Sequence, residues 1–293
     1  MEIRRADSAA DRRAVMAVWH AATQRSEPLG YHQALRLALL RRHEGTWWML
    51  EEDGRVLSSL MCYPFRFASG QQVQPAYGLG AVASRPESRR LGNAATLCRH
   101  AIEEAEREGR AVGLLFTAIP PAYYERLGFG VAPAWHHVCD AAGELAASGP
   151  QADLVPLDPR RDVPSLLACY QGAQTGLHVF RDEEEWRAGL VRNPSDVFFG
   201  LGEPVRGYVR LNPEYPQGVD VVELMVPTVE RATVLRTVAE LCVGLGRTVV
   251  EGWFDPVPEL ASLFEDRGRA KTQPMLRGVA ATEHARFWGS DYF

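Results

Sequence analysis

The sequence contains 293 residues, which is enough for two domains of ordinary size. Hydrophobic residues make up 46% of it and charged residues 24%, the usual balance of a soluble globular protein. The formal net charge of −5 gives no support to nucleic-acid binding, and no apolar run approaches the roughly 20 residues that span a membrane. We therefore expect no nucleic-acid and no membrane partner.

The cysteines and histidines indicate no metal site. The five cysteines are far apart and form no C-x-x-C pair, and the eight histidines include no H-x-x-x-H pair. We interpret the cysteines as small buried residues of a protein in a reducing compartment. We therefore expect a cytoplasmic protein without a metal cofactor.

Hydrophobic periodicity and turn residues predict alternating helices and strands in the first half of the chain. In chain order the expected elements are helices over 12–24 and 33–43, a hairpin over 46–67 that turns at Asp53-Gly54, a strand over 77–84, a helix over 93–108, a buried strand over 111–119 and a short helix over 120–129. A strand, a helix and a further strand in this order predict a mixed sheet of the α/β class with a right-handed crossover.

The second half repeats this order. A stretch rich in Ala, Gly and Pro over 141–164 marks the boundary, and "YYERLG" at 123–128 corresponds to "LFEDRG" at 263–268. The repeat predicts a duplicated domain with a period near 140 residues, the alternative being two unrelated segments that share a generic order. We expect domains at 1–145 and 151–293.

The stretch "RPESRRLGNAA", residues 85–95, places two arginines and a glycine before a helix. The first turn of a helix has unpaired N–H groups and a partial positive charge, so it favours an anion. Gly92 lets the backbone approach that anion closely, Ala94 keeps the second approach narrow, and Arg89 and Arg90 add charged donors. The pattern favours a pyrophosphate.

These features together resemble the Gcn5-related N-acetyltransferase (GNAT) superfamily. Its loop signature, R/Q-x-x-G-x-G/A, is matched from Arg89 to Ala94, and its closing signature of tyrosine, glutamate, a basic residue and Leu-Gly-Phe is matched from Tyr124 to Phe129. The resemblance covers residues 1–140. It implies an α/β (α+β) fold whose sheets are mixed, mostly antiparallel and flanked by helices.

Two tandem halves, of which only the first has the loop, are similar to the enhanced intracellular survival (Eis) type of acetyltransferase. The sterol-carrier-like domain that follows the two halves in that type has no room in this sequence. The resemblance implies two GNAT-like domains and favours a homo-oligomer. We infer that the second half binds no CoA, because "VPTVERATV" stands where the loop should be and contains no Arg-x-x-Gly.

The resemblance also assigns roles. It implies acetyl-CoA as the acetyl donor and Tyr124 as the general acid that protonates the departing thiolate. Tyr123 is the competing acid, and the residue aligned with Tyr124 in the second half is Phe264, which has no hydroxyl. The residues implied to bind the donor are Val82, Ala83 and Ser84 along the pantetheine arm, and Arg89, Arg90, Leu91, Gly92, Asn93, Ala94 and Ala95 around the pyrophosphate.

The general base and the acceptor stay open at this stage. Candidate bases are Glu51, Glu52, Glu223 and the carboxylate of Phe293, whose aromatic-rich tail we expect to fold back near the active cleft. The predicted function is acetyl transfer to a primary amine of a small molecule. The alternatives are a protein that binds acyl-CoA without turnover and an acetyltransferase of protein lysines or N-termini.

Overall fold

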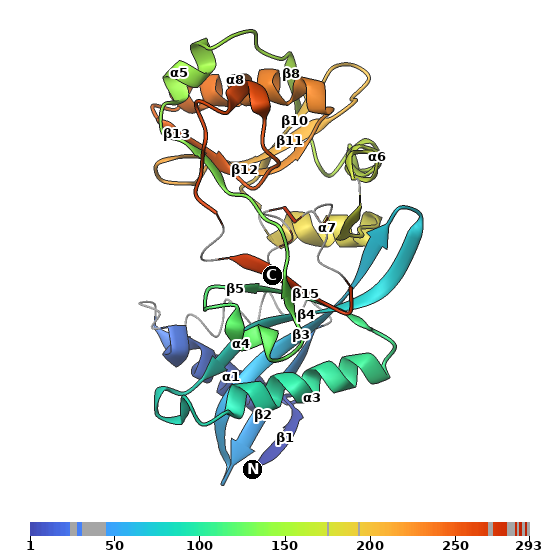
Figure 1. The fold of residues 1–293 in the computed structure, drawn as a ribbon, viewed down its shortest axis with the longest axis vertical. Helices are drawn as coiled ribbons and strands as arrows, with labels where there is room; N and C mark the ends of the chain where they lie inside the picture. The colour runs from blue at the N-terminus through green and yellow to red at the C-terminus, as the bar shows by residue number, and fades with distance from the viewer. Residues whose placement is uncertain are drawn as a thin grey trace. The chain divides into compact units, whose positions relative to one another are not determined.

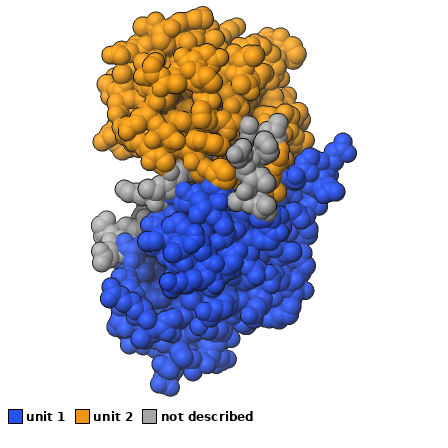
Figure 2. Space-filling model, viewed as in Figure 1, with its two compact units in different colours: residues 1–132, 272–283 blue, residues 133–271, 284–293 orange. Residues whose placement is uncertain are grey.

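The computed structural model describes residues 1–23, 28–30, 45–174, 176–192, 194–268, 272–279, 285, 287–288 and 291. The chain forms two compact units, which Figure 2 distinguishes by colour. Unit 1 comprises Met1–Ala132 and Thr272–Glu283, and unit 2 comprises Pro133–Lys271 and His284–Phe293. The helix expected over 33–43 lies outside the described residues apart from its flanks.

Unit 1 is built on a mixed sheet whose strands follow the order β1-β2-β3-β4-β5-β15-β6 (Figure 1). Neighbouring strands are antiparallel except β4 and β5, which are parallel. The strands are β1 (Glu2–Arg5), β2 (Thr46–Glu52), β3 (Arg55–Ser69), β4 (Gln72–Ser84), β5 (Val112–Thr117), β6 (Gly130–Val131) and β15 (Gln273–Arg277). The mixed sheet confirms the predicted fold class, although β1 had no recognisable signal in the sequence.

The helices of unit 1 cover both faces of this sheet. They are α1 (Ala9–Thr23), α3 (Asn93–Arg107) and α4 (Ala122–Glu125). Side chains alternate between the faces of a strand, so Trp47 and Met49 of β2 pack in one core cluster with α1, whereas Trp48 and Leu50 pack in another with α3. This double coverage explains why β2 is apolar on both sides.

The turn between β2 and β3 has the conformation that its sequence predicts. Asp53 and Gly54 have φ angles of 50° and 74°, and both values lie in the left-handed region that a tight two-residue hairpin turn requires. Aspartate and glycine tolerate this region better than most residues do. The hairpin fixes which residues of β2 face each helix.

Unit 2 repeats this architecture. Its seven-stranded sheet, drawn from the described residues, has the order β14-β7-β13-β12-β11-β10-β8, in which only β12 and β13 are parallel (Figure 1). The strands are β7 (His137–Cys139), β8 (Leu154–Leu157), β10 (Val197–Leu201), β11 (Tyr208–Asn212), β12 (Gly218–Met225), β13 (Val249–Gly252) and β14 (Glu265–Asp266). The helices are α5 (Ala142–Ala147), α6 (Val163–Ala173), α7 (Glu183–Arg192) and α8 (Arg231–Gly244), and a short strand, β9 (Leu177–Val179), follows α6.

The two sheets exchange a strand. In unit 1, β15 lies between β5 and β6, although it comes from the end of the chain. In unit 2, β7 lies between β13 and β14, although it follows β6 directly in the sequence. The predicted domains, 1–145 and 151–293, are continuous in sequence, whereas the compact units are not.

A shared irregularity supports the duplication. The pairing of β3 with β4 shifts register between Ser59 and Met61, and the pairing of β11 with β12 shifts between Arg210 and Leu211. In both sheets the shift falls just past the end of the parallel pairing. A β-bulge bends its strand and is retained where it has a use.

None of the helices in the described ranges is long and apolar enough to cross a membrane.

A buried aspartate beside a second acidic side chain is expected to make the stability of unit 2 depend on pH. Asp220 on β12 is in register with Glu251 on β13, whose Oε2 lies 3.6 Å from Nε2 of His136. Burial and the neighbouring Glu251 raise the pKa of Asp220 from its ordinary 3.8 to about 7. Since folding then takes up a proton, the free energy of unfolding falls as the pH rises from about 4 to about 7.

We predict that the Asp220→Asn variant lacks this fall. Urea unfolding at pH 5 and pH 8 measures the effect, because the wild-type protein should lose a few kcal/mol more than the variant between these values. Asp153→Asn, at an exposed position of the same unit, is the control and should follow the wild type. An equal pH dependence of wild type and Asp220→Asn would contradict the prediction.

Candidate active site

The candidate site begins where the two parallel strands of unit 1 separate. The pairing of β4 with β5 runs from Ala76 opposite Val112 to Leu79 opposite Leu115 and extends no further. Beyond this point β4 continues to Ser84. The sheet is therefore open between the two strands.

Val82, Ala83 and Ser84 form the wall of this opening. On one edge the strand still pairs with β3, with Ala83 opposite Ser59 and Ser84 opposite Ser58. The hydroxyl oxygens of Ser58 and Ser84 lie 2.7 Å apart and share a hydrogen bond. On the other edge, this stretch has no strand partner among the described residues, so its main chain can pair with an extended ligand in the manner of an added strand.

The loop after β4 ends in a left-handed turn at the start of α3. A short 3₁₀ turn over Pro86–Ser88 precedes it, and Arg90 and Gly92 then have φ angles of 64° and 83°. The first hydrogen bond of α3 runs from the amide of Thr96 to the carbonyl of Gly92, at 3.0 Å. In the described part of the chain, no acceptor is bonded to the amides of residues 90–95. Successive free amides of this kind form a concave anion site.

Hydrogen bonds from two arginine side chains to backbone carbonyls outside the loop hold it in place. The guanidinium of Arg85 donates to the carbonyl of Val56 at 2.6 Å, and that of Arg89 donates to the carbonyl of Ala22 at 3.1 Å. Arg89 and Arg90 are both exposed, as is Leu91, whereas Asn93 is buried under the first turn of α3. The cations therefore face solvent beside the free amides, with Ala94 and Ala95 half-buried behind them.

Gly92 has a backbone conformation that favours glycine. A Cβ at this position would meet no protein atom within 4 Å, so the space into which a ligand could come close is free of protein, and the predicted close approach of an anion stays a prediction. What requires glycine is the positive φ angle, which a side chain adopts only at a cost. The residue therefore shapes the turn that presents the amides.

Tyr124 lies in α4. This helix follows β5 in the chain, and β5 is one of the two strands between which the sheet is open. Its ring meets those of Tyr123 and Phe129 edge-on, with centroids 4.8 Å and 6.3 Å away. It packs in the same core cluster as Leu97 and Cys98 of α3. Burial, with smaller contributions from Cys98 and Tyr123, raises the pKa of the phenol, which therefore stays protonated at neutral pH.

The structure thus places Tyr124, the loop and the open edge of β4 in one unit, on elements that pack around one core cluster. Phe293 lies outside the described residues. Within the described ranges no group of three or more His, Cys, Asp or Glu side chains could hold a metal ion.

Two candidate bases lie on the β2–β3 hairpin. Glu51 accepts from the guanidinium of Arg4 at 2.8 Å, and Glu52 is exposed near the turn. Arg4 also pairs with Asp11 of α1, at 2.8 Å. These contacts fasten β1 and α1 to the sheet, and they give Glu51 a structural partner.

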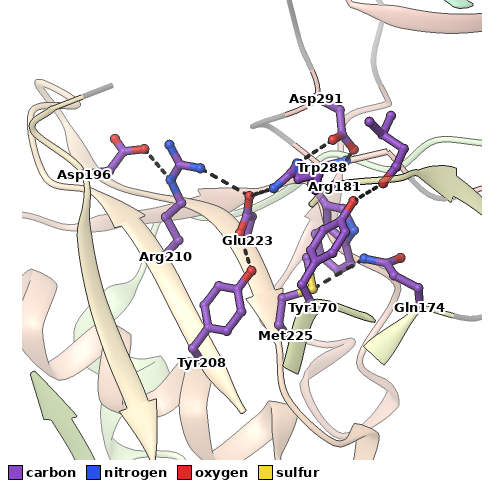
Figure 3. A network of polar contacts seen from close by, with 11 residues as sticks. Tyr170, Gln174, Arg181, Asp196, Tyr208, Arg210, Glu223, Met225, Trp288 and Asp291 are labelled. Carbon is purple, nitrogen blue, oxygen red and sulfur yellow. Dashed lines mark hydrogen bonds and ion pairs between the residues drawn. The ribbon is translucent and has the colours of Figure 1, made fainter. Parts of the chain in front are cut away.

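Glu223 is the centre of a buried polar network in unit 2 (Figure 3). One carboxylate oxygen accepts from the guanidinium groups of Arg181 and Arg210 at 2.7 Å and 3.3 Å, and the other accepts from the hydroxyl of Tyr208 at 2.6 Å. Arg210 also donates to Asp196 at 2.7 Å. Glu223 is fully buried with both oxygens engaged, so the geometry favours a structural role and not that of a base.

The same network holds the end of the chain. The guanidinium of Arg181 lies 4.5 Å from the ring centre of Tyr170 and forms an ion pair with Asp291 (Figure 3). Asp291 in turn accepts from the amide of Trp288 at 2.9 Å. The described tail residues Trp288 and Asp291 therefore pack within unit 2, as the apolar composition of the tail suggested, whereas its expected position near the active cleft stays a prediction. The sequence analysis did not recognise Arg181 and Asp291 as partners. The signal available for each was a single charged residue close to apolar residues, which can indicate a buried ion pair.

Unit 2 lacks the features of the loop in unit 1. A 3₁₀ turn over Thr228–Glu230 leads directly into α8, and its N-cap, Glu230, has a φ angle of −99°. In the described stretch directly before this helix, residues 219–230, no residue has a positive φ angle.

The comparisons with known proteins agree with this description. Residues 2–132 match the family described as "Acetyltransferase (GNAT) domain". This part of the chain is therefore similar to a GNAT acetyltransferase domain, and GNAT acetyltransferases use acetyl-CoA as co-substrate. No curated protein matches the chain in sequence.

Solved structures of the same class resemble nearly the whole chain. A GCN5-related N-acetyltransferase from Kribbella flavida has a TM-score of 0.71 at 18% identity, over 94% of this chain and 70% of that one. A probable N-acyltransferase of unknown function from Enterococcus faecalis has a TM-score of 0.74 at 15% identity, over 94% and 72%. Eis1 from Mycobacterium abscessus has a TM-score of 0.65 at 19% identity, over 94% and 73%. At sequence identities this low, the structural likeness shows the fold alone.

The conformation of Gly92 leads to a prediction about stability. Gly92→Ala should lower the free energy of unfolding by about 1 kcal/mol, because alanine is strained at a φ of 83° although nothing obstructs its methyl group. Gly172→Ala is the matched control, since Gly172 lies in α6 with equally open surroundings, and it should stabilise slightly. Urea unfolding of both variants measures the difference, and a loss of equal size in both would refute the explanation.

The two differently placed glutamates lead to a second prediction. Glu223→Ala should destabilise the protein by about 3–5 kcal/mol, because it leaves two buried guanidinium groups without their shared carboxylate. Glu51→Ala removes a half-exposed ion pair and should cost less than about 1 kcal/mol. Thermal unfolding compares the variants, and similar shifts in Tm would contradict the structural role of Glu223.

Proposed function

We propose that the protein is an acetyl-CoA-dependent N-acetyltransferase and that unit 1 binds the donor and transfers its acetyl group to a primary amine of a small molecule. The observation that carries this proposal is the open edge of β4 leading into a left-handed turn at the start of α3. An extended arm with a pyrophosphate at one end matches such an arrangement. The GNAT match over residues 2–132 supports the same chemistry.

The pyrophosphate would bind at residues 89–95. The amides of this stretch and the partial positive charge of the 15-residue helix α3 suit an anion, and Arg89 and Arg90 supply charged donors. The pantetheine arm would pair with the free edge of Val82, Ala83 and Ser84. In this proposal the thioester would meet Tyr124, which lies in α4 directly after β5.

In the proposed reaction a neutral amine attacks the thioester carbonyl. A C–N bond forms, the C–S bond breaks, and the departing thiolate takes the proton of the Tyr124 hydroxyl. The attacking nitrogen releases one proton to solvent as the amide forms, and the tyrosinate regains one from solvent, so the products are the acetylated amine and free CoA. The phenol of Tyr124 carries its proton throughout the neutral range, so it is present in the form that can donate.

The acceptor is proposed to be cationic before it reacts. The net charge of −5 steers cations toward the protein, which fits polyamines, amino sugars and lysine side chains alike. We propose that unit 2 binds no second CoA, because the turn before α8 has no left-handed glycine, and that it contributes to the acceptor site or stabilises unit 1. A cytoplasmic location and association into a homo-oligomer belong to the same proposal.

The experiment that tests donor binding is a calorimetric titration with acetyl-CoA. The wild-type protein should bind it, and Arg89→Glu should weaken binding at least tenfold, because the reversed charge repels the pyrophosphate. Arg107→Glu is the control, since Arg107 is an exposed cation in the last turn of α3, at the end away from the loop, and it should have a much smaller effect. Absence of binding by the wild-type protein would overturn the proposal.

Turnover with a panel of amines distinguishes the alternatives. Acetylation of small primary amines would support the proposal, whereas acetylation of lysine peptides alone would indicate a protein acetyltransferase. Binding of acetyl-CoA without transfer to any amine would indicate a CoA-binding protein without turnover.

The role of Tyr124 leads to a kinetic prediction. Tyr124→Phe should lower kcat about 10²-fold or more and change KM little, because the hydroxyl acts when the thiolate departs. Phe129→Leu, which alters the packing of the same ring without touching its hydroxyl, is the control for indirect effects. A kcat of Tyr124→Phe close to that of the wild type would exclude Tyr124 as the acid.

A further inference from the structure

Tyr123 has a buried hydroxyl group without a hydrogen-bond partner in the protein. Its ring is half-buried and meets the ring of Tyr124 edge-on, with centroids 4.8 Å apart. By contrast, the hydroxyl of Tyr77, another buried tyrosine of unit 1, bonds to the guanidinium of Arg277 at 3.4 Å. A buried hydroxyl without a partner costs about 1–3 kcal/mol, so proteins usually satisfy it.

The surroundings of this hydroxyl indicate where a partner would come from. Tyr123 packs against the core cluster that contains Leu97 and Cys98 of α3. Burial raises the pKa of its phenol to about 12, Cys98 adds to the effect, and Arg99 opposes it. Tyr123 therefore packs against the core that includes the buried face of α3, the helix that follows the free amides of residues 90–95.

Val82, on the open edge of β4, packs against the same core cluster as Tyr123, so Tyr123 belongs to the side chains that surround the proposed donor site. The loop at the start of α3 would hold the pyrophosphate, and Tyr124 would meet the thioester. The arm that joins these two groups in CoA contains two amides and a hydroxyl, which supply oxygen acceptors along its length. A phenol that keeps its proton can donate to any of them.

We propose that Tyr123 is a donor-binding residue whose hydroxyl group donates a hydrogen bond to an amide or hydroxyl oxygen of the pantetheine arm. The inference rests on the proposed function and adds a residue to it. It also assigns different tasks to adjacent tyrosines, because Tyr123 holds the arm while Tyr124 protonates the thiolate.

The test compares two ligands and two conservative variants. CoA carries the arm, whereas ADP carries an adenosine and a pyrophosphate without it. Tyr123→Phe should raise the Kd for CoA about 5–10-fold and leave the Kd for ADP unchanged. Because it also removes an unsatisfied polar group, it should leave the Tm of the unliganded protein equal or raise it by a few degrees.

Tyr77→Phe is the matched control. Tyr77 lies on the paired part of β4 and its hydroxyl has a partner, so its loss should lower Tm and leave the Kd for CoA unchanged. A weaker affinity for CoA together with an undiminished Tm is the combination that supports the proposal.

Three results would overturn it. An unchanged Kd for CoA in Tyr123→Phe would mean that the hydroxyl is satisfied by water. A loss of kcat with an altered pH profile, at an unchanged Kd, would make Tyr123 the acid. Failure of the wild-type protein to bind either ligand would refute the proposed function itself, and the inference with it.

Discussion

Beyond Leu79, β4 separates from β5 while its other edge stays hydrogen-bonded to β3. An interior strand edge that pairs with no neighbour is costly unless something else pairs with it, because main-chain amides and carbonyls need partners. The bulge bends the strand at this point, the left-handed turn at Gly92 follows, and α3 then returns across the sheet. The open edge of β4, the turn at Gly92 and the start of α3 thus follow one another in the chain from the point where β4 leaves β5.

Unit 2 contains the same separation and uses it differently. The pairing of β12 with β13 ends at Val221, and Glu223 lies two residues further along the strand. Its carboxylate binds Arg181, which in turn binds Asp291 near the end of the chain. One half therefore retains an open edge with small residues, whereas the other has a buried charge network at the corresponding place. Loss of the glycine turn before α8 agrees with this difference.

The local features could be predicted from the sequence, and the long-range ones could not. Asp53-Gly54 and Gly92 have conformations that few other residues tolerate, and the residues of α3 repeat with helical spacing. The edge to which a short strand such as β15 pairs depends on partners far away in the sequence, which periodicity does not report. The same limit concealed the network, because Arg181, Glu223 and Asp291 meet only after folding. The hydroxyl of Tyr123 is likewise recognisable as unsatisfied only once its surroundings are known.

The reciprocal exchange of β7 and β15 has a consequence for the origin and integrity of the chain. Two identical molecules that trade an equivalent element form a domain-swapped dimer, and joining the end of one to the start of the other gives the arrangement seen in this protein. Gene fusion of such a dimer would preserve the trade while letting the two copies diverge. Cleavage at the junction would then leave each fragment with a gap in its sheet and a surplus strand. The halves are in this sense obligate complements, and a mutation that weakens either short strand acts on the sheet of the opposite repeat.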